Sequence, residues 1–288
     1  MVAAPVPQTR RTWPAPAKIN LFLQVVGKRD DGYHLLQTIF QFLDFGDELS
    51  FSITDDGSIS RDYDFGFSEQ QDLCLRAAHL LKTFAKHSQG VRINLHKRLP
   101  MGGGLGGGSS DAATVLIALN ELWGLGFSRS KLAEFGLQLG ADIPVFVMGQ
   151  AAWAEGVGEQ LSPIELYQPW YLVLIPEIQV STAQIFSNKH LTATPRMKKI
   201  RALESTQQTT FGKNQLQDIV VDLFPEIAEH LDWLLQFGPA RMTGSGACIF
   251  LPIADKARGI EILAQRPKNT DGFVAKGLNI HPLFDSGC

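Results

Sequence analysis

The chain has 288 residues, of which 44% are hydrophobic and 19% are charged, and its formal net charge is -3 at pH 7. This length and composition are typical of a globular protein with one large domain or two smaller ones, and we expect two, over residues 1–160 and 161–288. The mild negative charge and the shortness of the basic run at residues 96–98 argue against nucleic acid and an anionic membrane as partners, so we expect a small molecule.

Cysteine and histidine are scattered along the chain. Cys74, Cys248 and Cys288 form no C-x-x-C pair, which argues against a zinc site and a disulfide framework, and no two histidines show the H-x-x-x-H spacing. We therefore expect no structural metal and a cytoplasmic location. The longest apolar runs are of the order of residues 171–175, far below the roughly 20 residues that span a bilayer. We also expect a monomer or a weak homodimer.

Hydrophobic periodicity predicts strands alternating with helices in both halves of the chain, which indicates an α+β or α/β architecture. The alternation in KINLFLQV, residues 18–25, predicts a strand on which Lys18 and Asn20 point to the same side, about 6 to 7 Å apart. Further strands are predicted at residues 35–43, 48–53, 91–99, 151–156, 170–177, 247–252 and 272–276. Helices are predicted from residue 71 to before residue 90, over 109–124, 130–139 and 256–265, and a mobile loop at 204–210.

The most unusual segment is LPMGGGLGGGSSDAA, residues 99–113, in which six of the seven residues from Gly102 to Gly108 are glycine. Each glycine costs about 0.5 to 1 kcal/mol relative to alanine in ordered structure, and a surface turn rarely needs more than one or two. A glycine-rich loop that leads into a helix lets several backbone N–H groups converge on one anion, which the helix dipole also attracts. We therefore expect a phosphate-binding loop, with the N-cap and first turn of the helix at residues 109–111.

The spacing of these glycines fits neither of two common nucleotide-binding motifs. Gly102, Gly104 and Gly107 satisfy G-x-G-x-x-G, but the dinucleotide-binding fold needs an acidic residue about 20 positions later, and the sequence around Phe127 has none. No lysine follows the glycines, so the P-loop pattern also fails. An NAD-dependent dehydrogenase is therefore disfavoured.

Three motifs together resemble the GHMP superfamily of small-molecule kinases. They are the P-x-G-G-G-L-G-x-x-S-S segment at residues 100–110, PAKINLFL at 16–23 and RMTGSGACIF at 241–250. Within this superfamily, DGYH at 31–34, GADIPVF at 140–146 and VSTAQIF at 180–186 resemble the family of 4-diphosphocytidyl-2-C-methyl-D-erythritol kinases. The resemblance implies a two-domain α+β fold, with an N-terminal domain similar to a ribosomal protein and a ferredoxin-like C-terminal domain. It also implies ATP-dependent phosphorylation of the 2-hydroxyl of a substrate that carries a cytidine diphosphate group, in non-mevalonate isoprenoid biosynthesis.

The resemblance also implies roles for particular residues in the transfer. Asp142 matches the aspartate that accepts the proton of the attacking hydroxyl, and Lys18 matches its partner lysine on the first strand. ATP would bind to the glycine loop, which we define as Pro100, Met101, Gly102, Gly103, Gly104, Leu105, Gly106, Gly107, Gly108, Ser109 and Ser110.

For the second substrate, the resemblance implies that Asn20 holds the polyol, that Tyr33 and Phe186 stack on the cytosine ring, and that His34 reads its edge. The turn of Gly244, Ser245 and Gly246 would fold toward the same site. Mg²⁺ would accompany ATP, but its ligands are undetermined, since Asp111 is the only clear carboxylate at the start of the loop helix.

Without the resemblance, the same residues have plainer explanations. Asp142 precedes Pro144 and suits a helix cap, Lys18 suits a solvated strand position, and Phe186 suits a core position. The turn at residues 244–246 suits a tight hairpin connection. Two other functions stay open at this stage: a protein that senses ATP without turnover, and a superfamily kinase for homoserine or mevalonate.

Overall fold

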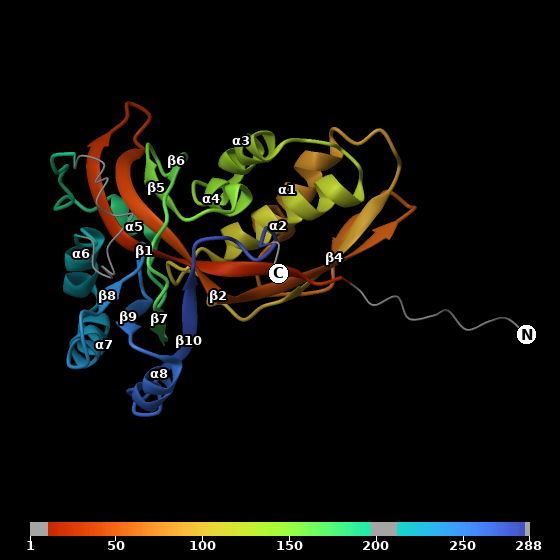
Figure 1. Ribbon diagram of the computed structural model, residues 1–288. Coiled ribbons are helices and arrows are strands. Elements are labelled where there is room, and N and C mark those ends of the chain that lie inside the picture. The colour runs from red at the N-terminus through yellow and green to blue at the C-terminus, as the bar shows by residue number, and fades with distance from the viewer. Residues whose placement is uncertain (1–10, 197–211, 286–288) are drawn as a thin grey trace, which may run out of the picture.

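The computed structural model describes residues 11–196 and 212–285, and its frame is a long antiparallel hairpin (Figure 1). The hairpin consists of β1 (Trp13–Lys28) and β2 (His34–Thr54), which pair along almost their whole length. Most side chains of β1 are buried on both faces, so its polar residues Lys18 and Asn20 lie inside the protein. The predicted mobile loop at residues 204–210 lies outside the described residues.

One long strand replaces the two strands predicted at residues 35–43 and 48–53. Gly46, in the stretch between them, is paired with Pro16 of β1 at a point where the register shifts. A Cβ atom on Gly46 would lie 2.2 Å from the backbone oxygen of Ala15, so glycine is needed because β1 passes so closely. In the sequence this glycine is typical of a turn, whereas in the fold it lets a bent strand continue.

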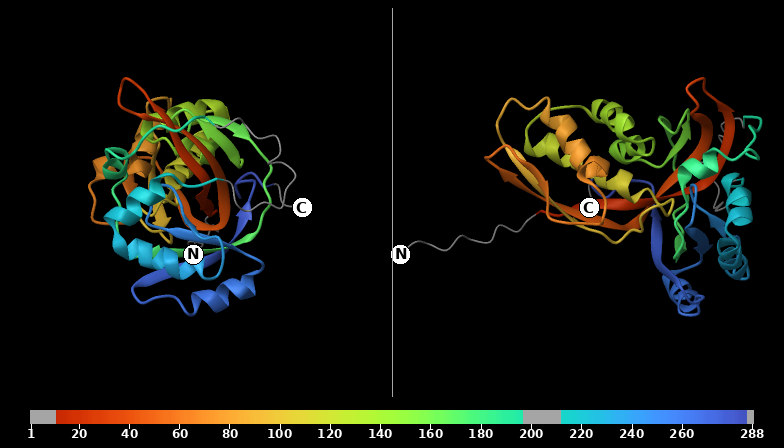
Figure 2. Two further views of the ribbon diagram at one scale, coloured as in Figure 1. Left: turned by 90° about the vertical axis from the view of Figure 1, so that its left-hand side faces the viewer. Right: turned by 180° about the vertical axis from the view of Figure 1, so that it is seen from behind.

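The N-terminal part of the structure is a sheet with helices on one of its faces (Figures 1 and 2). Strand β2 pairs with β4 (Gly90–His96) and β5 (Ala152–Glu155), while β3 (Ile59–Arg61) pairs with β4 and β6 (Gln160–Pro163) pairs with β5. The helices are η1 (Glu69–Gln71), α1 (Leu73–Lys82), α2 (Gly107–Leu122), α3 (Arg129–Leu139) and α4 (Ile143–Met148).

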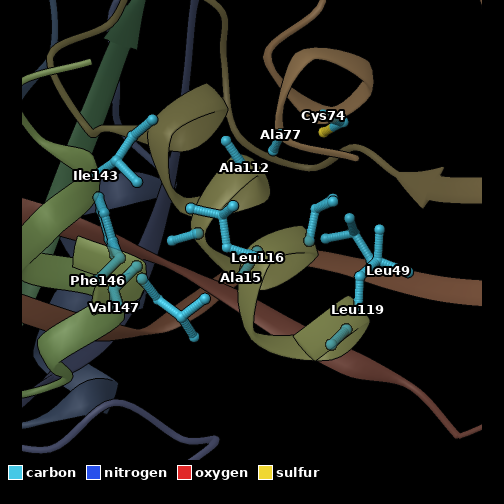
Figure 3. Close-up of a cluster of buried hydrophobic side chains, with 14 of the residues drawn as sticks. Ala15, Leu49, Cys74, Ala77, Ala112, Leu116, Leu119, Ile143, Phe146 and Val147 are labelled. Atoms are coloured by element: carbon cyan, nitrogen blue, oxygen red, sulfur yellow. The ribbon is translucent and has the colours of Figure 1, made fainter. Parts of the chain in front are cut away.

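The buried core of this part lies between the helices and the sheet. Figure 3 shows Leu116 and Leu119 of α2 beside Phe146 of α4 and Leu49 of β2, all fully buried. Helix α2 is therefore covered on several sides, which fixes the position of its N-terminus and of the glycine loop before it.

The C-terminal part is a second antiparallel sheet, in the order β10, β7, β9, β8, with helices against one face. Helices α6 and α7 were not predicted, whereas β7, β9, β10 and α8 confirm the predictions to within a few residues. The bounds are β7 (Trp170–Pro176), α5 (Thr182–Phe186), α6 (Leu216–Leu223), α7 (Pro225–Leu235), β8 (Arg241–Met242), β9 (Ile249–Ile253), α8 (Lys256–Leu263) and β10 (Thr270–Leu278).

The two parts share a hydrophobic core and a short strand contact. β10 pairs with β2 through two residue pairs, of which Gly277 with Leu43 is one. The face of the second sheet that carries Tyr171 and Phe250 packs against Ile19 of β1. The predicted domain division after residue 160 stays a prediction. Among the described residues, every helix falls short of the length and apolar character that crossing a membrane requires.

Candidate active site

A cleft of about 960 Å³ lies where the two parts meet. Its lining comes from β1, β2, the glycine loop, the start of α2, the residues just before α4, helix α5 and the turn at residues 244–246. Every motif that carries the family resemblance therefore contributes to one concave surface. A cleft of this size is typical of a binding site for small molecules.

The glycine loop turns sharply into α2 at the edge of this cleft. Gly102, Gly104 and Gly106 have φ values of 72°, 77° and 74°, which residues with a Cβ atom rarely adopt. Helix α2 begins at Gly107 with Gly106 as its N-cap, so the N-cap predicted within residues 109–111 is wrong, although Ser109 and Ser110 lie in the first turn as predicted. The left-handed glycine already reverses the chain there, before the serine side chains are reached.

The start of α2 faces the cleft with unpaired backbone donors. The first N–H groups of an α-helix have no partner within the helix, and Gly107, Gly108 and Ser109 all line the cleft. Leu105 and Ser110 are buried behind the lining, and the Leu105 carbonyl accepts a hydrogen bond of 2.9 Å from the backbone N of Lys18. The loop is thus tied to β1 beside the lysine that the resemblance singles out.

Lys18 and Asp142 form an ion pair in the cleft, with 3.1 Å between Lys18 Nζ and Asp142 Oδ2. The Lys18 side chain is only 3% exposed, so it is no solvated strand lysine. Asp142 lies at the N-cap position of α4, but its side chain makes no capping hydrogen bond. The cap explanation of Asp142 therefore fails, and the carboxylate instead faces Lys18 with about a third of its surface exposed.

Asn20 lies beside the ion pair, as the predicted strand alternation requires. Its Oδ1 accepts a hydrogen bond of 2.7 Å from Lys18 Nζ, and its Nδ2 donates one of 2.8 Å to the Thr38 hydroxyl. Both ends of the amide therefore have partners within the protein, and Asn20 holds Lys18 as well as lining the cleft.

One end of the cleft carries Tyr33, His34 and Phe186. The His34 and Phe186 rings lie 5.4 Å apart between centroids, while Tyr33 is 63% exposed at the tip of the turn between β1 and β2. Burial, together with the charge of Lys28, lowers the pKa of His34 below its ordinary value of 6.5. At pH 7 the imidazole is therefore mainly neutral and offers one donor and one acceptor to a ligand.

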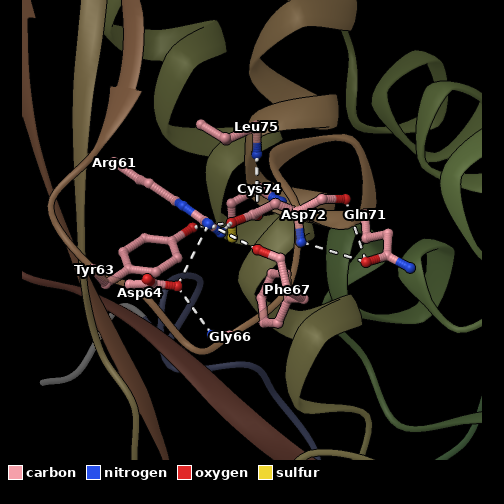
Figure 4. Close-up of polar contacts among 10 residues, drawn as sticks. Arg61, Tyr63, Asp64, Gly66, Phe67, Gln71, Asp72, Cys74 and Leu75 are labelled. Carbon is pink, nitrogen blue, oxygen red and sulfur yellow. Dashed lines mark hydrogen bonds and ion pairs between the residues drawn. The ribbon is translucent and has the colours of Figure 1, made fainter.

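The opposite end of the cleft is a wall of aromatic residues, Tyr63, Phe65 and Phe67, which the sequence analysis did not find. Asp72 holds this wall in place (Figure 4). One of its oxygens accepts hydrogen bonds of 2.7 Å from Arg61 and 2.9 Å from the Tyr63 hydroxyl, and the other caps the N-terminus of α1. The signal in the sequence was the alternation of aromatic residues in YDFGF.

A buried cluster of three titratable side chains lies behind the start of α2. Lys97 Nζ is 2.6 Å from Asp47 Oδ2 and 2.7 Å from Asp111 Oδ2, and the other oxygen of Asp47 accepts from the backbone N atoms of Arg98 and Leu99. These contacts join the chain that enters the glycine loop to the helix that leaves it. Asp111 thus serves a lysine partner within the protein, and its Oδ1 is buried without a hydrogen-bond partner.

The turn at residues 244–246 joins β8 to β9 and lies against the glycine loop. A Cβ atom on Gly244 would be 3.1 Å from the Cα atom of Gly104, so the two loops touch through glycine. The Ser245 hydroxyl lies 2.7 Å from that of Thr182 at the start of α5, and both residues line the cleft. The turn is therefore a strand connection and also part of the site.

Comparison with known proteins decides the family of this chain. The family model for the GHMP kinases N terminal domain matches residues 72–150, and that for GHMP kinases C terminal matches residues 195–270. The 4-diphosphocytidyl-2-C-methyl-D-erythritol kinase of Thiobacillus denitrificans is 52% identical over 276 residues, which cover 96% of this chain and 98% of that protein. The chain belongs to this family of GHMP kinases.

Further relatives agree with this assignment. The Shewanella woodyi protein of the same name is 51% identical over 94% of this chain and 95% of its own length. A crystal structure of a 4-(cytidine 5'-diphospho)-2C-methyl-D-erythritol kinase superposes with a TM-score of 0.82 at 31% identity, over 93% of this chain and 99% of that one. The mevalonate kinase of Methanococcus jannaschii, with a TM-score of 0.66 at 14% identity, shares the fold.

The two family models and the structural match thus confirm the predicted superfamily and the two-domain fold. The residues that the sequence singles out, namely the loop, Lys18 and Asp142, lie together in one cleft of the structure. Sequence reasoning missed Thr38 and Thr182, because a threonine on a strand or at a helix start is ordinary. Thr182 lies inside the VSTAQIF motif, so the motif itself was a signal for this residue.

The buried carboxyl group of Asp111 leads to a prediction on stability. Burial, together with the negative charge of Asp47, raises the pKa of Asp111 from 3.8 to about 8, although Lys97 opposes this. Asp111 keeps its proton in the folded state at pH values where the unfolded chain loses it, so its contribution to stability declines as pH rises between these two values. We expect Asp111→Asn to remove this decline.

Urea unfolding of the wild type and of Asp111→Asn at several pH values measures the effect. The free energy of unfolding of the variant minus that of the wild type should increase from pH 5 to pH 8, by up to about 1.4 kcal/mol per pH unit. A difference that does not change with pH would show that Asp111 is ionised in the folded protein.

Proposed function

We infer that this protein transfers the γ-phosphoryl group of ATP to the 2-hydroxyl of 4-diphosphocytidyl-2-C-methyl-D-erythritol, giving the 2-phosphate and ADP. This is a step of non-mevalonate isoprenoid biosynthesis. Support comes from relatives of that name at about 50% identity over nearly the whole chain. The observation on which the mechanism rests is the position of the Lys18–Asp142 pair, in one cleft with the start of α2.

ATP fits the side of the cleft that the glycine loop and α2 form. The unpaired N–H groups at the start of α2 suit the phosphates, because an anion there meets both the donors and the positive end of the helix dipole. The aromatic wall of Tyr63, Phe65 and Phe67 lies at the far end and offers faces on which the adenine can stack. ATP would then extend from this wall to the Lys18–Asp142 pair.

The second substrate fits the opposite end of the cleft. Tyr33 and Phe186 supply flat faces for the cytosine ring, and the neutral His34 can exchange hydrogen bonds with its edge. The linked polyol would then reach the floor of the cleft at Asn20, with the hydroxyls of Thr182 and Ser245 beside it. Two flat bases at opposite ends place the reacting phosphate and hydroxyl between them.

At the centre of the cleft, Asp142 accepts the proton of the attacking hydroxyl while Lys18 stabilises negative charge on the transferred group. An alcohol becomes acidic only as its oxygen bonds to phosphorus, so the proton moves late in a loose transition state. The enzyme therefore contributes mainly position and charge, and position alone is worth roughly 7 to 11 kcal/mol when two reactants are held in line.

Mg²⁺ would accompany ATP. The described residues contain no group of three or more His, Cys, Asp or Glu side chains that could hold a metal ion. Mg²⁺ keeps several waters and binds largely through substrate phosphates, so the Ser109 hydroxyl at the start of α2 would be its contact with the protein. When bound, the ion neutralises phosphate charge. We place the reaction in the cytoplasm, which suits the unpaired Cys74 and Cys248.

Substrate choice tests this function directly. ADP release should occur with the cytidine-linked methylerythritol, and phosphorus NMR should show a new phosphomonoester at the 2-position. Removal of the cytidylyl group, which leaves methylerythritol 4-phosphate, should reduce kcat/KM by about 100-fold or more, because it removes a stacked base worth about 1 to 3 kcal/mol and its edge contacts. Equal activity without cytidine, or turnover of mevalonate or homoserine instead, would refute the proposal.

A further inference from the structure

Thr38 lies on β2 in the floor of the cleft, next to the residues that hold Lys18. It is 1% exposed, and β1 and β2 pair it with Leu23. Its hydroxyl is the second partner of the Asn20 amide, at 2.8 Å from Asn20 Nδ2. None of the motifs quoted above includes it, and the mechanism above does not use it.

The direction of each hydrogen bond at Thr38 is fixed by a backbone carbonyl. The Thr38 hydroxyl lies 2.5 Å from the Phe22 carbonyl oxygen, which can only accept a hydrogen bond. Thr38 must therefore donate its one proton to Phe22, and its oxygen can only accept from Asn20. An amide oxygen turned toward this hydroxyl would find no proton there, so the Nδ2 end of Asn20 has to face Thr38.

This orientation decides what Asn20 presents to Lys18. With Nδ2 on Thr38, the oxygen Oδ1 faces Lys18 and accepts its hydrogen bond of 2.7 Å. The backbone N of Asn20 donates a hydrogen bond of 2.9 Å to the Thr243 hydroxyl, and that hydroxyl lies 3.4 Å from Asn20 Oδ1, which favours the same orientation of the amide. In the reverse orientation the Lys18 ammonium would meet an NH₂ group, and a donor facing a donor repels.

We propose that Thr38 is a positioning residue for phosphoryl transfer: its hydroxyl orients the Asn20 amide, which holds the Lys18 ammonium beside Asp142. The proposal rests on the function proposed above. The Lys18 ammonium has three N–H donors, of which Asn20 and Asp142 take two, so the third points to the reacting groups only while the first two are in place. With 1% of its surface exposed, Thr38 acts through this chain of contacts.

The test compares Thr38→Val and Thr38→Ser with the wild type. Valine keeps the shape of threonine but removes the hydroxyl, so Asn20 Nδ2 loses its acceptor and the amide is held less firmly. We expect kcat to fall about 10-fold, as the loss of one buried hydrogen bond in the chain implies. The KM values for ATP and for the cytidine-linked substrate should stay within about twofold. Serine retains the hydroxyl, and Thr38→Ser should restore most of kcat.

A matched control separates positioning from a general loss of stability. Thr114 on α2 is also fully buried and donates a hydrogen bond of 3.1 Å to a backbone carbonyl, that of Pro14. Thr114→Val removes a buried threonine hydroxyl in the same way and should lower the melting temperature, with kcat unchanged. If Thr38→Val keeps full kcat, if it changes both KM values instead, or if Thr114→Val loses as much kcat, the role of Thr38 is refuted. An inactive wild type would refute the proposed function itself.

Discussion

Replacement of Asp142 by asparagine is expected to lower kcat by about 10³-fold, while ATP still binds. General acid–base catalysis contributes about 10² to 10⁴-fold, and an amide of the same shape cannot accept the proton of the attacking hydroxyl. The proposed ATP-binding side of the cleft is built from the glycine loop and the aromatic wall, whereas Asp142 precedes α4 and pairs with Lys18. ADP release would measure kcat, and isothermal titration with ATP would measure binding.

Asp232→Asn makes the same chemical change on the exposed side of α7, outside the cleft, and should leave kcat unaltered. Retention of kcat within a few fold in Asp142→Asn would show that another group takes the proton, and would remove the proposed base. Loss of ATP binding together with kcat would instead show that Asp142 contributes mainly to nucleotide binding. The same measurement tests the rival function of an ATP sensor. Such a protein would release no ADP, either as the wild type or as Asp142→Asn.

The glycine loop could be predicted from the sequence because its backbone conformation requires glycine at particular positions. Gly102, Gly104 and Gly106 all lie in the left-handed region, so the need for glycine is visible in the residue types themselves. The start of α2 was predicted incorrectly because the prediction relied on side-chain preferences at the N-cap. Serine and aspartate are the residues preferred at an N-cap, but the reversal of the chain is complete at Gly106.

The site could be predicted only in part, because its central pair depends on tertiary structure. Alternation along β1 places Lys18 and Asn20 on one side, and their hydrogen bond confirms this. Nothing local to Asp142 connects it to Lys18, and only the resemblance paired them. Thr38 was beyond reach for the same reason, since its partner on β1 becomes apparent only when the register of the hairpin is known.

One part of the fold was missed although the sequence carried its signal. Helix α7 begins at Pro225, a favoured first helical residue, and its buried residues Ile227, Leu231 and Leu234 have helical spacing. Helix α6 lies directly before it, with Phe224 as the residue between them. The periodicity of this segment is therefore sufficient to predict α7. Strand β8 has two residues, which are too few to show an alternation of apolar and polar side chains.

The second large effect is expected from Gly104→Ala. Gly104 has a φ of 77°, and a Cβ atom there would lie 2.2 Å from the backbone oxygen of Thr243. The left-handed backbone costs an alanine about 1 to 2 kcal/mol. The clash adds about 1 to 3 kcal/mol, because the atoms that the Cβ would meet belong to the backbone of Thr243 and Gly246 and cannot move away as a side chain could. The free energy of unfolding should fall by about 2 to 5 kcal/mol, and the KM for ATP should increase, since the loop must shift away from the turn at residues 244–246.

Gly102→Ala provides the matched control for the contact between these two loops. Gly102 has nearly the same backbone conformation, with a φ of 72°, but a Cβ atom there would meet nothing within 4 Å. Its substitution should cost only the left-handed strain of about 1 to 2 kcal/mol, so urea unfolding should separate the two variants clearly. Equal losses of stability in Gly104→Ala and Gly102→Ala would mean that the loop can shift at Gly104 without cost. In that case the close approach of the Thr243 backbone would not be what fixes the phosphate-binding loop against the rest of the cleft.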